Sequence, residues 1–442
     1  MFRFDILFIV LIAASLPVCL WKPWIGVLVF SWLAGMYPQR LVGGLAYDLP
    51  FSKFVAGAIL IGLLFTKERY VLPRRREVYL IGALWLTFVA STLFTALEPE
   101  RAWIKLADVS KILLMTGVTM VLFQARTKLR WLLLVTSLSF GCIGIYGGVW
   151  GIVTRFQGQL FGPPGSWIAD NNALGFAFTM VLPLLAYVRQ EEESRAVRGL
   201  LLIAFGLTIV ALFATYSRGA FLGFCLVLPL IALQLRTKDV ALLGTAVAAC
   251  LVIYLTPRQW VERMQTITPH AHRTESSGVQ RMKAWYVAYR LGVDHPLLGA
   301  GFFPFSPAVY SHYIPGYSDD HDAHNHFLQL FAEHGLIGLA LFMALMLSVF
   351  QTLWRLGRSI RGDPRRRWIG HYVPMIGIAV IAFAAEGIFI NAPYLDLYFE
   401  LVAATVVLQE IAASADGNAA AVCDERWIVV TLRRARVMRG PA

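Results

Sequence analysis

Long apolar stretches follow one another along nearly the whole of this chain, and short charged segments separate them. A helix needs roughly 20 apolar residues to cross about 30 Å of hydrocarbon. Composition agrees with such spans, because 58% of the 442 residues are hydrophobic and 15% are charged, against about 25% charged residues in a soluble domain. These features predict an all-α polytopic membrane protein. They exclude a soluble enzyme, a disordered chain and a nucleic-acid-binding domain.

The hydropathy pattern predicts about twelve membrane spans. The first stretch is interrupted by Trp21-Lys22-Pro23-Trp24 and is ambiguous, since it could be two short helices or one kinked helix. Counting it as one crossing places both termini on the same side of the membrane. The expected spans are 4–36, 50–66, 78–96, 104–124, 129–153, 170–188, 198–215, 218–234, 238–254, 323–354, 369–391 and 394–413.

The distribution of Lys and Arg predicts the sidedness of the connecting segments. One side holds 25 of the 39 basic residues, the other side holds 12, and two lie within spans. The positive-inside rule places the larger group in the cytoplasm. The chain then divides into spans one to nine over 1–254, an external loop domain over 255–322, the last three spans over 323–413, and a basic cytoplasmic tail over 414–442. We expect this tail to lie on an anionic inner leaflet.

Histidine is concentrated in one part of the external layer. Eight of the nine His lie between His270 and His334, and the densest run, Ser318 to His326, leads directly into an apolar span. The spacing matches no known metal site, so a hydrated loop is favoured over a metal centre. His324 alone is a better hypothesis, as a general base. It lies where the chain enters the membrane, and a helix N-terminus there would keep its ring neutral.

A second candidate site is the short junction Thr215-Tyr-Ser-Arg-Gly219 between two apolar spans. Ser217 is a suitable N-cap, so Arg218 falls in the first turn of the following helix. Free backbone N–H groups, the helix dipole and the guanidinium would then form an anion site. The alternative is that Arg218 anchors the chain to lipid headgroups.

The loop domain 255–322 contains a predicted amphipathic helix around Val279–Arg290, lying over the bundle at the membrane interface. Lys283 and Arg290 flank its apolar face, and Arg281 points nearly opposite to it. These cations could serve only to extend toward the headgroups. The expected apolar face consists of Val279, Met282, Tyr286, Tyr289 and Val293.

The segment from Arg155 to Asn172 contains the rigid run Gly162-Pro-Pro-Gly165 and then Asp170-Asn-Asn172. The Asp-Asn-Asn trio is most simply an N-cap for the next span. Its amides would also suit a sugar or a diphosphate if they faced a polar cavity. Further acidic residues near the bilayer are expected to face inward; they are Glu386, Asp396 and Glu400.

Taken in order, these segments resemble the O-antigen ligase and polymerase superfamily of bacterial integral membrane glycosyltransferases. The most specific match is His324-Asn325, nine residues, then Gly335-Leu-Ile-Gly338. It fits the pattern of the lipopolysaccharide O-antigen ligases and the related probable O-glycosylation ligases. Two further runs fit the wider superfamily and are Ser-Arg-Gly at 217–219 and Arg281…Trp285…Pro296…Gly299-x-Gly301. The resemblance covers about 161–391.

The resemblance implies a GT-C-type helical fold in the bacterial inner membrane, with a large periplasmic loop and an active site facing the periplasm. It implies a glycan donor carried on undecaprenyl diphosphate and a sugar hydroxyl of lipid A-core as acceptor, with no metal, cofactor, nucleotide sugar or nucleic acid. By this resemblance His324 is the essential histidine, and Arg218 and Arg281 are the essential arginines. The residues alone add Arg155, Lys283, Asp170 and Asn172 as further substrate-binding candidates. Direct attack by the acceptor on the anomeric carbon would invert its configuration.

Other functions stay open at this point. An O-antigen polymerase would use another lipid-linked glycan as acceptor, and a protein O-oligosaccharyltransferase would use Ser or Thr. A transporter would carry ionisable groups at mid-membrane in repeated halves, whereas here polar residues gather in one external layer. A non-catalytic lipid-glycan binding scaffold is a fourth possibility.

Overall fold

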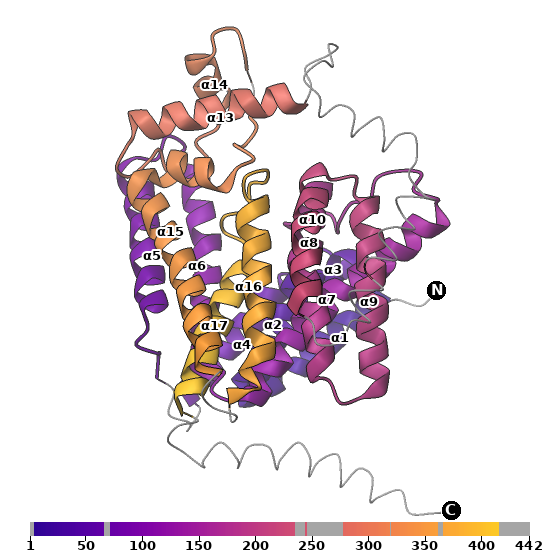
Figure 1. Ribbon diagram of the computed structural model, residues 1–442. Coiled ribbons are helices and arrows are strands. Elements are labelled where there is room, and N and C mark those ends of the chain that lie inside the picture. The colour runs from indigo at the N-terminus through magenta and orange to yellow at the C-terminus, as the bar shows by residue number, and fades with distance from the viewer. Residues whose placement is uncertain are drawn as a thin grey trace, which may run out of the picture.

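The computed structural model describes residues 4–65, 71–234, 244, 277–318, 320–360 and 366–414. Within these limits every regular element is a helix, and most of the helices lie side by side in one bundle whose upper end is crossed by α13 (Figure 1). The elements are α1 Phe4–Trp21, α2 Pro23–Met36, α3 Pro38–Val42, η1 Gly44–Ala46, α4 Phe51–Phe65, α5 Arg76–Phe94, α6 Pro99–Leu122, α7 Arg126–Val153, α8 Asn171–Glu191, α9 Arg195–Ala214, α10 Arg218–Gln234, α13 Ser277–Asp294, α14 Pro307–Tyr313, α15 His326–Ser359, α16 Ile369–Glu386 and α17 Asp396–Ser414.

Eight of the described helices are long and apolar enough to cross a membrane, and three shorter apolar helices accompany them. The expected all-α polytopic fold is therefore confirmed, and the chain is a multi-pass membrane protein. The predicted span 238–254 apart from residue 244, the first part of the loop domain (255–276) and the tail from 415 lie outside the described residues.

The first apolar stretch departs from the single crossing expected over 4–36. Leu45, which follows α2, donates its backbone N–H to Asp5 Oδ2 near the start of α1 (3.2 Å), and the rings of Phe8 and Trp32 are 6.0 Å apart. Both contacts require the start of α1 to lie beside the end of α2. The stretch is therefore an antiparallel hairpin that turns at Lys22, and the single crossing was wrong.

This hairpin also changes the predicted position of the N-terminus. Tyr37, Lys53 and Asp396 line one cavity, so α2 ends at the end of the bundle where α4 and α17 begin. Residue 4 lies at the same end of the bundle as Tyr37, whereas residue 414 lies at the opposite end. The first and last described residues are therefore on different sides of the membrane. The charge pattern could not reveal this, because counting Lys22 in place of Arg3 leaves the total of 25 basic residues unchanged.

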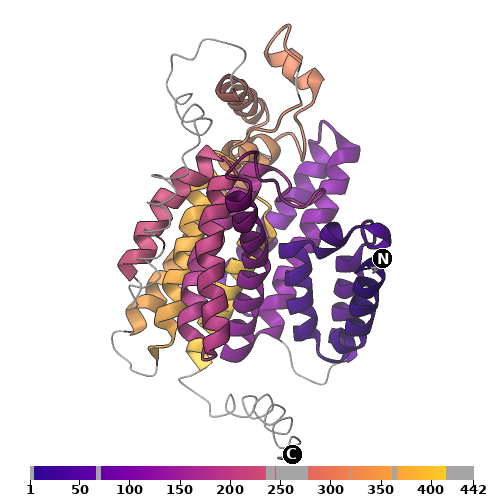
Figure 2. The same cartoon turned by 90° about the vertical axis from the view of Figure 1, so that its right-hand side faces the viewer.

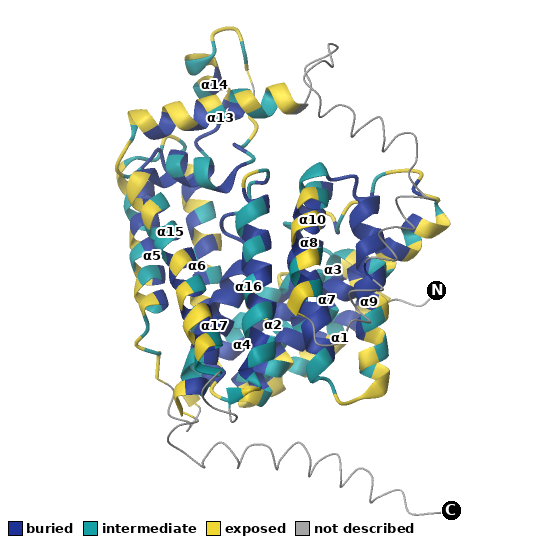
Figure 3. Cartoon of the chain, in the orientation of Figure 1, coloured by how far each residue is buried: buried dark blue, intermediate teal, exposed yellow. Residues whose placement is uncertain are grey.

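Helix α8 forms the centre of the bundle. Its apolar window is 94% buried, and α7, α9, α10 and α16 pack around it. The burial map in Figure 3 shows the inner faces of these helices in dark blue and their exposed faces in yellow. The loop that precedes α8 is therefore held on a rigid base.

Helix α15 is kinked at Gly335, which has φ 62° and ψ −162°. The loop 296–301 runs alongside this kink, since Leu336 N–H donates to the Pro296 carbonyl (2.8 Å) and Gly301 N–H donates to the Glu333 carbonyl (3.0 Å). A Cβ at Gly335 or Gly299 would overlap the opposing backbone, and both have positive φ. Close backbone packing and positive φ thus explain glycine at positions 299 and 335.

Helix α13 lies where the amphipathic helix was predicted, and it runs across the end of the bundle (Figures 1 and 2). Its packed face is different from the expected apolar face, because small and branched residues contact the head of α15 and the following loop. The packed residues are Ala284, Val287, Ala288 and Leu291. The expected stripe is exposed on the opposite side and comprises Val279, Met282, Tyr286, Tyr289 and Val293.

Candidate active site

The junction between α9 and α10 forms the first part of the site. α9 ends at Ala214, and Tyr216 adopts a left-handed conformation (φ 55°) that reverses the chain. Ser217 Oγ accepts the backbone N–H of Ala220 (3.3 Å), so it caps α10 as predicted. Arg218 is consequently the first residue of α10. Arg218 therefore lies at a helix N-terminus, where the macrodipole also favours an anion.

The loop before α8 is fastened to this junction by its amides. Asp170 caps α8 and accepts the backbone N–H groups of Asn172 (2.9 Å) and Ala173 (3.3 Å), as predicted. Asn171 Nδ2 donates to the Thr215 carbonyl (2.9 Å). Asn172 Oδ1 accepts the Ser217 hydroxyl (2.9 Å). The trio therefore joins two helix starts and sets the Asp170 carboxylate beside the first turn of α10.

Arg281 approaches the same point from α13. Burial lowers the pKa of the Arg281 guanidinium, the Arg218 charge lowers this pKa further, and Asp170 acts in the opposite direction. Arg218, Arg281 and Asp170 thus interact electrostatically, although 63 positions separate the two arginines in the sequence. Two cations with one carboxylate leave this cluster with an excess of positive charge. Such a cluster favours an anionic ligand.

His324 lies in the loop that leads into α15 and faces the same cluster. The residue is half-buried and has φ 47°, a strained conformation for a residue with a side chain. Burial lowers the pKa of the His324 ring, and the charges of Arg281 and His321 lower it further, against Asp170. The ring is therefore neutral near pH 7 and can accept a proton.

The start of α15, which follows His324, is capped by the next residue. The Asn325 side chain accepts the backbone N–H groups of Phe327 (3.0 Å) and Leu328 (3.1 Å), so Asn325 caps α15 and uses the free donors of its first turn. Asn325 Nδ2 also donates to the Ile388 carbonyl (3.1 Å). Burial and the neighbouring charges favour the neutral form of His324, and the contribution of the helix terminus stays a prediction.

His326, only two residues later, is packed inside the bundle. Its ring is fully buried, lies 4.8 Å from the Phe383 ring and 5.7 Å from the Phe176 ring, and its backbone N–H donates to the Gly387 carbonyl (2.7 Å). His321 is exposed, with its ring 6.5 Å from that of His324. Of the three neighbouring histidines, the geometry favours His324 as the reactive group.

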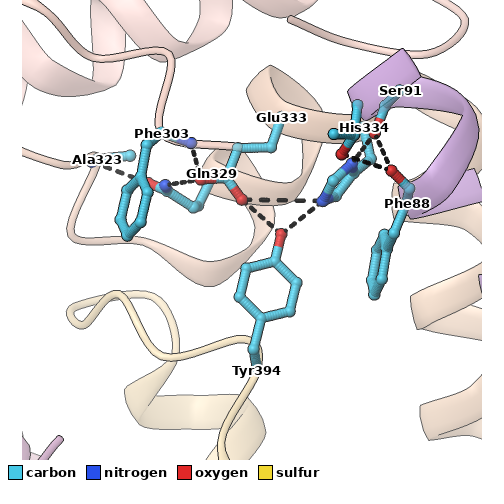
Figure 4. A network of polar contacts seen from close by, with 9 residues as sticks. Phe88, Ser91, Phe303, Ala323, Gln329, Glu333, His334 and Tyr394 are labelled. Atoms are coloured by element: carbon cyan, nitrogen blue, oxygen red, sulfur yellow. Dashed lines mark hydrogen bonds and ion pairs between the residues drawn. The ribbon is translucent and has the colours of Figure 1, made fainter. Parts of the chain in front are cut away.

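A second polar network lies beneath this loop and was not predicted from the sequence (Figure 4). Tyr394 donates its hydroxyl hydrogen to Glu333 (2.5 Å) and lies 2.8 Å from His334 Nε2. His334 Nδ1 lies 2.7 Å from Ser91 Oγ. Ser91 Oγ donates to the Phe88 carbonyl (3.0 Å), and the donor in each of the two His334 contacts depends on the tautomer of the ring. This buried chain of hydrogen bonds ties α5, the head of α15 and the 391–395 turn together.

A cavity of about 730 Å³ opens beside this network. Its wall includes Lys105, Asp322, Asn391 and Asp396. Asn391 Nδ2 donates to Asp322 Oδ2 (2.7 Å), whereas burial raises the pKa of Asp322 against this hydrogen bond and the Lys105 charge. The signal that could have indicated this cavity is the spacing of charged residues in α6, at 101, 105 and 108, which places them on one helix face.

The other two predicted substrate-binding residues, Arg155 and Lys283, have different surroundings. Arg155 is exposed in a left-handed turn after α7 (φ 52°). The Lys283 ammonium lies 3.7 Å from the centroid of the Tyr317 ring, a cation–π contact. The structure thus brings together Arg218, Arg281, Asp170 and His324. Asn172 supports this arrangement through its hydrogen bond with Ser217.

The three acidic residues near the bilayer occupy different environments. Glu400 accepts a hydrogen bond from Thr136 inside the bundle. Glu386 is buried against Gly223, where a Cβ would overlap its carboxyl group. Asp396 instead lines the cavity. In the described part of the chain, no group of three or more His, Cys, Asp or Glu side chains could hold a metal ion.

Comparison with known families divides the chain into two parts. Residues 3–192 match a family of unknown function (DUF5935), and no curated protein matches the chain. Residues 203–343 match the family described as O-Antigen ligase, and this range includes Arg218, Arg281 and His324. The resemblance of this multi-pass membrane protein to the O-antigen ligase and polymerase superfamily is therefore confirmed by the match over residues 203–343.

Proposed function

We propose that the protein is an inverting, metal-independent glycosyltransferase of GT-C type that moves a glycan from undecaprenyl diphosphate to a sugar hydroxyl of lipid A-core. Arg218 and Arg281 bind the diphosphate of the donor, and His324 is the general base. Asp170 and Asn172 orient this cluster, and Arg155 and Lys283 are weaker candidates for contacts with the glycan. The reaction takes place at the periplasmic face of the bacterial inner membrane.

One observation carries this proposal. Three segments that are distant in the sequence bring two guanidinium groups and one neutral imidazole to the same end of the bundle, around Asp170. An anion site beside a base matches what transfer from a lipid diphosphate requires. The family match supports the same conclusion, because the matched range contains all three functional side chains.

The chemical step follows from these groups. The acceptor hydroxyl attacks the anomeric carbon and forms the new C–O bond, while His324 takes the hydroxyl proton. The C–O bond to the diphosphate breaks, and the leaving diphosphate keeps the bonding electrons as negative charge. Arg218 and Arg281 stabilise this charge through bidentate hydrogen bonds. No covalent intermediate forms, so the configuration at the anomeric carbon is inverted.

The predicted sidedness supports a periplasmic reaction. The cluster and α13 lie at the end of the bundle that carries the loop domain (Figure 1), and the loops at this end hold the smaller share of basic residues. The positive-inside rule places such loops outside the cytoplasm, where lipid-linked glycans are available after their translocation.

Reconstitution tests this function directly. The purified chain in lipid nanodiscs receives undecaprenyl-diphosphate-linked glycan together with lipid A-core, a second lipid-linked glycan, or a Ser/Thr peptide, each in a separate reaction. We expect glycan transfer to lipid A-core that continues in strong chelators. The Arg218→Lys variant should insert normally and lose most of its donor affinity, because Lys lacks the planar fork.

Each other outcome changes the proposal in a defined way. Transfer only to the second lipid-linked glycan would make the protein a polymerase, and transfer only to the peptide would make it a protein O-oligosaccharyltransferase. Donor movement across the membrane without transfer would indicate a transporter. Donor binding with no reaction of any kind would leave a binding scaffold, and activity that returns with one particular metal would remove metal independence.

A further inference from the structure

The cavity beside the arginine cluster contains charged residues that have no role in the proposed binding of the diphosphate. Charged residues from α6 project along one face of a helix long enough, at 24 residues, to cross a membrane. Charged groups that face lipid are costly, so such residues normally line a polar space or a substrate path. Those that line the cavity are Lys105, Asp108 and Lys111.

The cavity and the arginine cluster share two structural elements. Asp322 lines the cavity and lies two residues before His324. Ala173 also lines it, and its backbone N–H donates to Asp170 in the cluster (3.3 Å). The loop that carries the proposed base is therefore bordered by an anion-binding cluster on one side and by this cavity on the other.

The charges of the cavity favour a different ligand from that of the cluster. Both carboxylates and ammonium groups line its wall, whereas the cluster has two guanidinium groups for one carboxylate. Lys105 Nζ lies 5.2 Å from the centroid of the Phe303 ring and 5.8 Å from that of Tyr394. Among the described residues, the Asp396 carboxylate has no hydrogen bond or ion pair and faces the cavity.

A saccharide matches this wall. Each sugar hydroxyl both donates and accepts a hydrogen bond, so it pairs equally well with a carboxylate and with an ammonium group. The aromatic rings of Trp167, Phe303 and Tyr394 offer apolar surfaces beside these polar groups. The volume of about 730 Å³ falls within the usual range of about 300–1,000 Å³ for small-ligand sites.

We propose that this cavity binds the sugar of the acceptor and delivers its hydroxyl to His324, and that the family of unknown function supplies the acceptor specificity. This inference rests on the proposed function for its reaction. Most of the lining residues belong to the 3–192 match, including Tyr37, Lys53, Lys105 and Trp167. The donor residues Arg218, Arg281 and His324 belong instead to the ligase match.

Lysine footprinting with the core oligosaccharide, released from lipid A by mild acid, tests the cavity without any donor. Amines of the full-length protein in nanodiscs are acetylated with and without the oligosaccharide, and each site is quantified by mass spectrometry. We expect Lys53 and Lys105 to lose reactivity when the oligosaccharide is bound. The exposed Lys22, at the opposite end of the bundle, is the matched control and should react equally in both samples.

Kinetics then separates acceptor binding from donor binding. In Asp396→Asn, the amide replaces a carboxylate of nearly the same size, so we expect the KM for lipid A-core to rise about tenfold to a hundredfold, the range for one hydrogen bond to a charged group. The Kd for the lipid-linked donor should stay unchanged. Asp48→Asn is the matched control, because Asp48 is exposed outside the cavity. Lys53→Gln, at an exposed position, gives the same test if Asp396→Asn fails to fold.

Three results would overturn the inference. These are absence of oligosaccharide binding, binding that leaves Lys53 and Lys105 fully reactive, and an Asp396→Asn or Lys53→Gln effect on donor affinity with no effect on the acceptor. Failure of the proposed function is distinguishable, because it would show as a wild-type protein that does not bind the lipid diphosphate. The footprint requires no donor and can be read in either case.

Discussion

Replacement of His324 by alanine separates catalysis from binding in this site. The ring is half-buried beside Arg281, and burial together with that charge holds its pKa below the ordinary value of 6.5. The wild-type base is therefore already neutral at pH 7, so its removal eliminates the full contribution of a positioned base. That contribution is about 10²–10⁴-fold in rate, or about 2.7–5.5 kcal/mol of transition-state stabilisation.

Donor affinity should change little in the same variant. The diphosphate is assigned to Arg218 and Arg281, and neither guanidinium is removed by His324→Ala. Single-turnover transfer therefore falls while the Kd for the lipid-linked donor stays near the wild-type value. The assay measures both quantities on the same nanodisc preparation, with thermal unfolding as a check on folding.

The neighbouring histidines are internal controls with different expected results. His321→Ala removes an exposed ring and should keep most of the rate. His326→Ala removes a ring that is packed against Phe383 and fully buried. It should lower the free energy of unfolding by about 2–5 kcal/mol, as for other core truncations, so any loss of transfer follows from instability.

The pH dependence gives a second reading of the same residue. A base must be unprotonated, so transfer decreases as the pH falls through the pKa of His324, which lies below 6.5. His321→Ala removes a charge that lowers this pKa, so the acidic limb of kcat/KM should move to higher pH. A His324→Ala enzyme that keeps most of its single-turnover rate, or an acidic limb that is identical in wild type and His324→Ala, would refute the role of His324.

Three further predictions follow from the same contacts. Asp170→Asn keeps a good N-cap but removes the carboxylate that raises the pKa of His324, so the acidic limb should move to lower pH; a shift to higher pH would contradict the arrangement. Arg281→Lys should weaken donor binding about tenfold to a hundredfold through loss of charged hydrogen bonds, measured as donor Kd, and an unchanged Kd would make Arg281 a surface anchor. Tyr394→Phe leaves two buried partners unpaired at about 1–3 kcal/mol each, so thermal unfolding should occur at lower temperature, whereas the exposed Tyr146→Phe should not change it.

Features governed by local sequence were predicted well. Hydropathy located the described apolar helices except for the division of the first stretch into α1 and α2, and the capping roles of Ser217 and Asp170 followed from side-chain chemistry at a helix start. The hairpin at Lys22 could not be decided, because Arg3 and Lys22 make equal contributions to the charge count. Only the contact between Leu45 and Asp5, forty positions apart, distinguishes a hairpin from one long helix.

Features that depend on contacts between distant parts of the sequence were harder to predict. The face of α13 that packs is made of Ala284, Val287, Ala288 and Leu291, whereas periodicity favoured the larger residues on the opposite side. Small residues pack there because the loop after α13 and the head of α15 approach closely. The buried partnership of Glu333 with Tyr394 joins segments 61 positions apart, and no local pattern indicates it.

The two family matches suggest where the functional differences within this superfamily arise. Ligases, polymerases and protein oligosaccharyltransferases all release a lipid diphosphate, and the residues assigned to that step lie in the 203–343 match. Their acceptors differ, and the cavity wall assigned to the acceptor lies mainly in the 3–192 match. Exchange of residues such as Lys53 and Lys105 should therefore alter which acceptor is used without altering donor affinity. On the proposed function, the motif around His324 is therefore the part to compare for the reaction, and the residues of α4 and α6 are the part to compare for the acceptor.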